Sequence, residues 1–205
     1  MTRVKICGIR EVAHAAAAIE AGADYLGFNF YPRVRRYIDP GDAEAILRAV
    51  DRSRTQIVGI FVNEAPATVR SIADRLNLDL IQLSGDEGPA CVAELGRPVA
   101  RTVHVSASTT LEDIERGRGP AAYIHLDCRQ NGQYGGTGVP IDWGFAGRVS
   151  AIGPVFLAGG LTPENVAEAI RVARPFAVDV ASGVEVDGRK HPERIRAFVA
   201  AARAA

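Results

Sequence analysis

Three short apolar segments of the chain carry chemically reactive side chains at every second position. This spacing is that of a β-strand, whose successive side chains point to opposite faces. Apolar residues occupy one face of each segment, and the other face holds Lys5 and Cys7, His125 and Asp127, and Asp179. Ionisable groups in a protein interior are costly unless they pair with one another or act on a ligand. Because a lysine beside a cysteine favours the thiolate, this set suggests acid–base chemistry.

The two strongest candidates also have purely structural interpretations. Cys7 ends its segment, where a reactive group would be accessible, but free cysteine is also a common small buried residue. Asp127 ends its own segment and either caps the glycine-rich loop 130–138 or acts as a general acid or base. We expect Lys5 and Asp179 to pair with each other, or Asp179 to contact substrate hydroxyl groups.

Two glycine turns and an arginine-rich segment indicate anion binding. Gly159-Gly160 and Ser182-Gly183 each follow an apolar segment, and glycine lets backbone N–H groups approach an anion closely. The segment 31–37 contains three arginines, which either bind a carboxylate through the guanidinium fork or form a solvated basic loop. The sequence therefore predicts a phosphate site at the two turns and leaves a carboxylate site open.

Eight strand-like segments alternate with eight helix-like segments. The strands are expected at 3–7, 25–30, 56–62, 80–83, 99–105, 123–127, 155–158 and 176–180, and the helices at 11–21, 40–50, 66–76, 89–95, 110–116, after 141, 163–172 and 191–202. Such alternation implies parallel pairing through right-handed crossovers. Eight units close most economically into an α/β fold of the (β/α)8 TIM-barrel type, with the active site at the C-terminal ends of the strands.

An open doubly wound sheet is the alternative fold. Sheets of that kind that bind dinucleotides carry Gly-x-Gly-x-x-Gly after the first strand, whereas here the first strand runs into Cys7-Gly8-Ile9-Arg10. No linker-like segment divides the chain, so residues 1–205 are expected to form a single domain. Strand parity places three further polar residues inside the barrel and three apolar residues outside it. They are, respectively, Asn63, Gln82 and Ser84, and Phe176, Val178 and Val180.

Composition narrows the possible partners. With 24 basic and 24 acidic residues the net charge is zero, which argues against a nucleic-acid binder that relies on bulk electrostatics. No run of about 18 apolar residues is present, so we expect no membrane segment. Three widely spaced cysteines without zinc-site spacing, and an N-terminus without a signal-peptide core, predict a reduced cytoplasmic protein. A monomer is expected, with a homodimer as the alternative.

Taken together, the motifs resemble the phosphoribosylanthranilate isomerase family of tryptophan biosynthesis. The resemblance runs almost from end to end, through residues 4–9, 23–28, 36–38, 59–63, 81–83, 126–127, 135–138, 142–143, 157–161, 163–166 and 178–185. It implies a (β/α)8 barrel that converts the aminoaldose N-(5-phosphoribosyl)anthranilate into the corresponding 1-deoxyribulose phosphate by an Amadori rearrangement. It implies no metal and no organic cofactor.

The resemblance also assigns roles to individual residues. Asp127 matches the general acid that protonates the ribose ring oxygen, and Cys7 matches the general base that removes the C2′ proton. Arg36 matches the arginine expected to hold the anthranilate carboxylate. The turns at Gly159-Gly160 and Ser182-Gly183 match the phosphate site, and Lys5 and Asp179 are further substrate-binding candidates.

The sequence departs from the family at three positions. Ser84 replaces the histidine usual after the fourth strand, Val34 replaces a serine, and Arg101 lies near a frequent lysine. These changes leave open a different substrate range, or a paralogue from a secondary-metabolite pathway. Another phosphosugar barrel enzyme, such as an epimerase or an indole-glycerol-phosphate synthase, would rely on metal-binding histidines or on several lysines and glutamates. A non-catalytic ligand-binding barrel would not need Cys7 together with Asp127.

Overall fold

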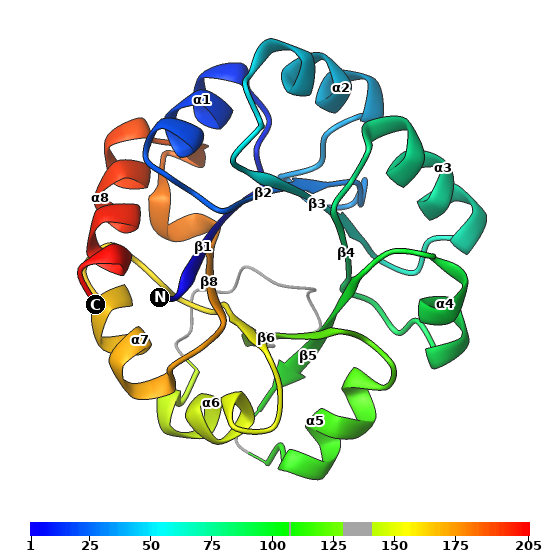
Figure 1. Ribbon diagram of the computed structural model, residues 1–205, viewed down its shortest axis with the longest axis vertical. Coiled ribbons are helices and arrows are strands. Elements are labelled where there is room, and N and C mark those ends of the chain that lie inside the picture. The colour runs from blue at the N-terminus through cyan, green and yellow to red at the C-terminus, as the bar shows by residue number, and fades with distance from the viewer. Residues whose placement is uncertain (107, 129–140) are drawn as a thin grey trace.

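Eight parallel strands close into a barrel that is surrounded by helices in the computed structural model (Figure 1). The structure describes residues 1–106, 108–128 and 141–205. Neighbours in the barrel follow chain order, and β8 pairs with β1 to close it. The predicted TIM barrel is therefore confirmed, and the open sheet is excluded. In the described part of the chain, no helix is long and apolar enough to cross a membrane.

The strands and helices fall close to their predicted positions. The barrel strands are β1 (Arg3–Cys7), β2 (Tyr25–Asn29), β3 (Gln56–Phe61), β4 (Leu80–Leu83), β5 (Val99–Val105), β6 (Tyr123–Cys128), β7 (Val155–Leu157) and β8 (Ala177–Val180). The helices are α1 (Val12–Glu20), α2 (Pro40–Ala49), α3 (Pro66–Leu76), α4 (Pro89–Glu94), α5 (Leu111–Arg118), α6 (Trp143–Ser150), α7 (Val166–Ala173) and α8 (Pro192–Arg203).

Local sequence explains where the helices begin. Among the described residues, the helices α2, α3, α4 and α8 start with proline. The fixed φ of proline suits the first helical position, and proline lacks the N–H that would be unpaired there. Asp39 and Asp142 cap α2 and α6 by accepting hydrogen bonds from Gly41 and Gly144. Thr110 and Asp113 form a capping box at the start of α5.

The barrel interior is built in tiers because every second residue of each strand points inward. The tier nearest the N-terminal ends is apolar and contains Tyr25, Val58, Leu80, Ala100, Phe156 and Ala177. Two residues further along the strands lie buried polar side chains, namely Lys5, Gln82, Thr102, His125 and Asp179. A further two residues along, Cys7, Ser84, His104 and Asp127 line the mouth of the barrel. The polar tier therefore lies between an apolar floor and the open mouth.

The side-chain orientation predicted from strand alternation is wrong at two positions. Phe176 does not face outward: it precedes β8 and packs against Tyr123 and Phe156 of the apolar floor, with Arg3 over its ring. Asn63 does not face inward either, because β3 ends at Phe61 and the exposed Asn63 adopts a φ of 52°. Parity applies only while the backbone stays extended, and both residues lie outside their strands.

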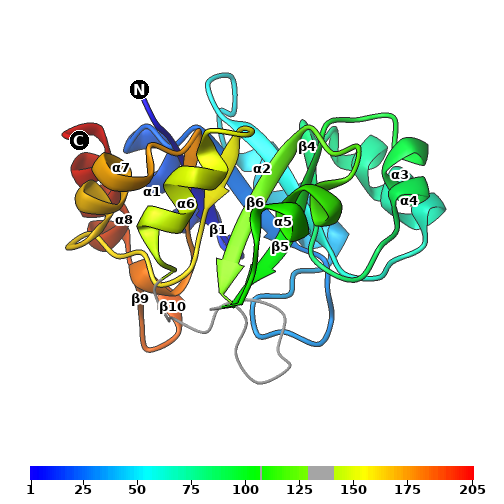
Figure 2. The same cartoon turned by 90° about the horizontal axis from the view of Figure 1, so that it is seen from below.

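A small antiparallel hairpin after β8 is an addition that the sequence analysis lacks. The 3-10 helix Ser182–Val184 leads into β9 (Glu185–Val186), which pairs with β10 (Arg189–Lys190). The hairpin and the segment after β2 extend from the C-terminal end of the barrel, whereas both chain termini lie at the other end (Figure 2). The mouth of the barrel is thus bordered by β9 and β10 on the side of β8.

Candidate active site

A cavity opens at the C-terminal ends of the barrel strands, where the sequence predicts an active site. Of the nine predicted site residues, seven line it: Cys7, Arg36, Asp127, Gly159, Gly160, Asp179 and Ser182. Lys5 lies beneath the cavity in the polar tier, and Gly183 packs behind the wall. An apolar wall of the same cavity includes Val34, Ile60 and Leu161. Residues from both halves of the sequence therefore surround one cavity.

Cys7 lies at the end of β1 in an environment that gives it room and positive neighbours. Gly27 on β2 lies directly opposite, and a side chain there would reach within 3.2 Å of the Cys7 Sγ. Burial raises the pKa of the Cys7 thiol, and the positive charges of Lys5 and Lys190 reduce this shift without cancelling it. Cys7 is therefore a thiol at rest, and its conversion to the thiolate is assisted by two lysines.

Asp127, unlike Cys7, is expected to donate a proton, and its surroundings favour the protonated form. Its side chain is buried at the end of β6, where Oδ1 accepts a hydrogen bond from the Cys128 N–H at 2.9 Å. Burial raises the pKa of Asp127, and His125 and His104 only partly oppose that rise. A carboxyl group whose protonated form is favoured in this way suits proton donation.

Lys5 and Asp179 form the buried ion pair that the strand order predicts. Lys5 Nζ donates to Asp179 Oδ2 at 2.7 Å, and the Lys5 side chain is only 1% exposed. Burial disfavours both charges, but Lys5 and His125 lower the pKa of Asp179 to about 2. The pKa of Lys5 is raised, because Asp179 and Cys7 outweigh the effect of burial. Both groups are therefore charged around neutral pH.

This ion pair belongs to a closed ring of hydrogen bonds across the barrel. The successive distances are Lys5–Asp179 2.7 Å, Asp179–His125 2.9 Å, His125–Thr102 3.2 Å, Thr102–Ser84 2.8 Å, Ser84–Gln82 3.1 Å and Gln82–Lys5 2.8 Å. Ser84, one of the three residues that depart from the family pattern, supplies the link between Gln82 and Thr102. A small hydroxyl at this position therefore completes the ring.

The ring has one consistent assignment of donors and acceptors. Lysine can only donate and an ionised carboxylate can only accept, so proton donation runs from Lys5 along both arms to Asp179. One arm is the direct ion pair, and the other passes through Gln82, Ser84, Thr102 and His125. Asp179 Oδ1, in contrast, is buried and has no hydrogen-bond partner among the described residues, although Asp179 lines the cavity. That oxygen is available to accept from a ligand.

The two glycine turns lie against each other at the side of the mouth. Gly159 and Gly160 have φ angles of 83° and 67°, which glycine adopts without strain. A side chain at Gly183 would lie 1.9 Å from the carbonyl oxygen of Leu161, so the turn after β8 packs directly on the turn after β7. The glycine-rich loop 130–138 and its motif 135–138 lie outside the described residues.

Arg36 comes from the segment after β2 and reaches the mouth over the end of β1. Its stem passes across Gly8, where a side chain would lie 2.6 Å from Arg36 Cδ. Arg36 Nε and Nη2 donate to the two carboxylate oxygens of Glu185 at 2.7 and 3.0 Å. Arg101, in contrast, bonds to Glu87 and is not among the residues that line the cavity.

Glu185 and Lys190 are the charged residues of the site that the sequence analysis does not assign. Both belong to the β9–β10 hairpin, and Lys190 Nζ donates to Glu185 Oε1 at 2.9 Å and to the carbonyl of Ala181 at 2.8 Å. A recognisable signal is present: Asp187-Gly188 is the preferred two-residue turn of a β-hairpin. Strands of two residues have no alternation to detect, so pattern reading misses them.

A closed (β/α)8 barrel with a half-buried thiol and a buried carboxyl group at its mouth is typical of enzymes of the TIM-barrel class. Residues 4–201 match the family model described as N-(5′-phosphoribosyl)anthranilate (PRA) isomerase. The chain belongs to this family and is an isomerase.

Curated relatives and solved structures agree with this assignment. The N-(5′-phosphoribosyl)anthranilate isomerase of Roseiflexus sp. (strain RS-1) is 46% identical over 100% of this chain and 99% of its own, and that of Geobacter sulfurreducens is 44% identical over 97% of each. The crystal structure of phosphoribosyl anthranilate isomerase from Thermotoga maritima superposes with a TM-score of 0.89 at 37% identity, covering 100% of both chains. A further crystal structure of such an isomerase, in complex with reduced 1-(o-carboxyphenylamino)-1-deoxyribulose 5-phosphate, gives a TM-score of 0.86 at 36% identity, again over 100% of both chains.

Proposed function

We propose that this enzyme isomerises N-(5′-phosphoribosyl)anthranilate in tryptophan biosynthesis, with Cys7 as general base and Asp127 as general acid. The observation that carries the proposal is the pair of residues itself. A thiol beside two lysines and a carboxyl group with a raised pKa line one cavity. Family membership points to the substrate, and the geometry supports one residue as proton donor and the other as proton acceptor for it.

The chemistry requires one proton delivered and one removed. Asp127 donates its proton to the ribose ring oxygen, the bond from that oxygen to C1′ breaks, and the anthranilate nitrogen forms a C=N bond to C1′. The Cys7 thiolate then takes the proton from C2′, the electron pair of that C–H bond forms a C1′=C2′ bond, and the π pair of the C=N bond returns to the anthranilate nitrogen. The resulting enolamine tautomerises to the ketone. Acid–base catalysis of this kind contributes about 10²–10⁴-fold per group.

The walls of the cavity suit the separate parts of the substrate. We place the phosphate at Gly159-Gly160 and Ser182-Gly183, where glycine allows close approach to backbone N–H groups. We place the anthranilate carboxylate at Arg36 and a ribose hydroxyl at Asp179 Oδ1. Lys5 acts from below by keeping Asp179 ionised and by favouring the Cys7 thiolate. The apolar wall at Val34 and Ile60 receives the aromatic ring.

A coupled assay tests the proposal. Substrate made in place from anthranilate and phosphoribosyl pyrophosphate is followed by its fluorescence, which falls as it isomerises. Wild-type protein should accelerate the fall, and Cys7→Ser or Asp127→Asn should lower turnover about 10²-fold or more. Cys91→Ser, at a cysteine on α4 away from the cavity, is the matched control and should keep full turnover. Fluorescence decay at the uncatalysed rate with wild-type protein would refute the proposed reaction.

We also propose that the enzyme is a cytoplasmic monomer. All three cysteines are free thiols, as a reducing compartment requires. Among the described residues, the large exposed apolar side chains are scattered singly along the chain, at Met1, Val12, Ile152, Val172 and Val186. One related structure is described as monomers generated from a dimeric isomerase of Thermotoga maritima, so the family includes a dimer. Light scattering at several protein concentrations distinguishes the two states.

A further inference from the structure

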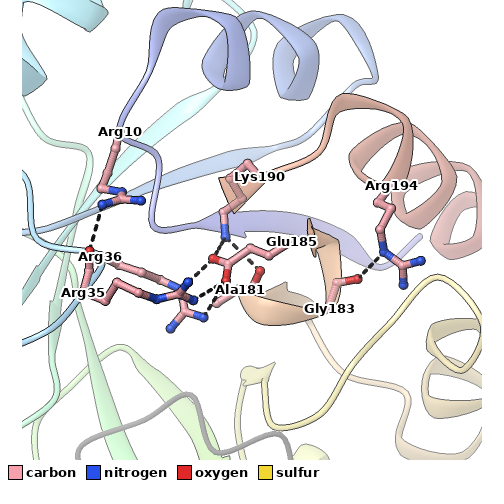
Figure 3. A network of polar contacts seen from close by, with 8 residues as sticks. All are labelled: Arg10, Arg35, Arg36, Ala181, Gly183, Glu185, Lys190 and Arg194. Atoms are coloured by element: carbon pink, nitrogen blue, oxygen red, sulfur yellow. Dashed lines mark hydrogen bonds and ion pairs between the residues drawn. The ribbon is translucent and has the colours of Figure 1, made fainter. Parts of the chain in front are cut away.

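Three cationic side chains converge on the carboxylate of Glu185 (Figure 3). Oε1 accepts from Arg36 Nε at 2.7 Å and from Lys190 Nζ at 2.9 Å, and Oε2 accepts from Arg36 Nη2 at 3.0 Å and from Arg35 Nη2 at 2.6 Å. The Glu185 side chain is 6% exposed. Burial disfavours its charge, but Arg36 and Lys190 outweigh burial and lower the pKa of Glu185 to about 2. This carboxylate therefore stays ionised and fixed in place.

The β9–β10 hairpin determines the position of Glu185. Asp187 and Gly188, with φ angles of 48° and 76°, connect β9 to β10 as a two-residue turn that needs positive φ at both positions. This turn sets the register in which Lys190 lies opposite Glu185. Lys190 is also tied to the backbone carbonyl of Ala181, just after β8. Glu185 is thus anchored to the barrel through its own strand and through Lys190.

Arg36 is held by one edge of its guanidinium group. Glu185 takes the Nε–H and one N–H of Nη2, which leaves both N–H groups of Nη1 and the second N–H of Nη2. Among the described residues, Glu185 is the hydrogen-bond partner found for this guanidinium. Arg36 lines the cavity, and the remaining edge has the fork geometry that binds a carboxylate with two parallel hydrogen bonds.

We propose that Glu185 is a positioning residue, which holds Arg36 so that its second edge receives the carboxylate of the substrate. This inference rests on the proposed function, in which Arg36 binds that carboxylate. A long arginine side chain without a fixed partner would lose rotamer freedom on binding, and Glu185 has already removed that freedom. Glu185 touches no substrate atom and acts through Arg36.

The alternative is that Glu185 only stabilises the fold. Two reduced product analogues separate these roles: one carries the 2-carboxyphenylamino group and the other carries a phenylamino group without the carboxylate. Wild-type enzyme should prefer the carboxylate analogue by about tenfold or more, the value of one charge-assisted hydrogen-bond pair. Glu185→Gln keeps the size of the side chain and removes its charge. It should lose most of this preference and raise KM about tenfold, with kcat changed less than about threefold.

Two further variants make the result decisive. Arg36→Ala should abolish the preference, and adding Glu185→Gln to it should cause no additional loss. Arg189→Ala is the matched control, because Arg189 lies in the same hairpin but pairs with Glu11 on the surface, and it should leave both inhibition constants unchanged.

The outcomes separate the two proposals. Intact preference in Arg36→Ala overturns the carboxylate assignment of the proposed function. Lost preference in Arg36→Ala with intact preference in Glu185→Gln overturns the positioning role alone. If Glu185→Gln does not fold, Glu185→Asp keeps the charge but shortens its reach. An intermediate preference in that variant supports the proposal, and an unchanged preference overturns it.

Discussion

Replacing Asp127 by asparagine should reverse the response of the enzyme to alkaline pH. The active form needs Asp127 protonated and Cys7 deprotonated, yet an ordinary aspartate titrates near pH 3.9 and an ordinary thiol near 8.5. Burial raises the pKa of both groups in the same direction, and we expect the order of the ordinary values, with Asp127 losing its proton before Cys7, to be kept. When Asp127 and Cys7 together hold one proton, that proton is therefore mostly on Cys7. The active form, with the proton on Asp127 and a thiolate at Cys7, is a small fraction of the enzyme, and this fraction is constant between the two pKa values.

This order of ionisation fixes the expected slopes. In the wild-type enzyme kcat/KM should be flat between the pKa of Asp127 and that of Cys7, and should fall above the latter. In Asp127→Asn only the thiolate fraction matters, so the residual kcat/KM should rise about tenfold for each pH unit. From about pH 7 to about pH 8.5 the defect of the variant should shrink about thirtyfold. The substrate phosphate does not interfere, since its second pKa lies near 6.

The fluorescence assay at low substrate concentration gives kcat/KM directly across this range. Cys7→Ser serves as the control, because its residual activity should lack the rising slope. A flat or falling profile for Asp127→Asn between about pH 7 and about pH 8.5 would show that thiolate formation does not limit the reaction. The assignment of Cys7 as general base would then be wrong.

Three other perturbations have outcomes set by the contacts described above. Lys5→Met leaves the Asp179 carboxylate buried without its cation and should lower the free energy of unfolding by about 3–5 kcal/mol in urea titrations, whereas Arg48→Ala, at an exposed ion pair, should cost less than about 1 kcal/mol. Gly183→Ala forces the turn away from Leu161 and should raise KM about tenfold and weaken inhibition by inorganic phosphate, while Gly88→Ala, with open space around it, should change neither. The pKa of Asp179 falls from 3.8 to about 2 on folding, so its ionisation contributes about 2 kcal/mol of stability that is present above about pH 4 and lost as the pH drops toward 2. Asp179→Asn should flatten that part of the plot of unfolding free energy against pH. An unchanged plot would contradict the depressed pKa.

Strand alternation predicted the inward side chains well where the strands are regular. Lys5, His125 and Asp179 all belong to the buried polar tier, and the predicted pairing of Lys5 with Asp179 is confirmed at 2.7 Å. The fold followed from the count of strand–helix units. The inward side chains could be predicted because both faces of each strand are buried: the helices cover one face, and the barrel interior constrains the other.

The prediction was incomplete where loops bring charges together. Alternation could place Arg36 after the second strand, but it could not show that Glu185 occupies one edge of its guanidinium. That contact joins residues 149 positions apart and depends on a turn of two residues. Strand alternation also could not reveal the closed ring of hydrogen bonds among six side chains, because closure of that ring depends on the stagger of neighbouring strands around the barrel.

The charges at the mouth explain why a thiol among cations keeps a raised pKa. Lys5, Lys190 and Arg36 bring three positive charges near Cys7, but Asp179 and Glu185 each have a pKa of about 2 and return two negative charges. Asp127, which is expected to lose its proton before Cys7, adds a third negative charge, so no positive excess remains to offset the cost of burying a thiolate. A substrate that carries both a phosphate and a carboxylate therefore meets no net positive charge among these groups. Directed hydrogen bonds, from the backbone at the glycine turns and from the free edge of Arg36, must therefore supply the rest of its binding.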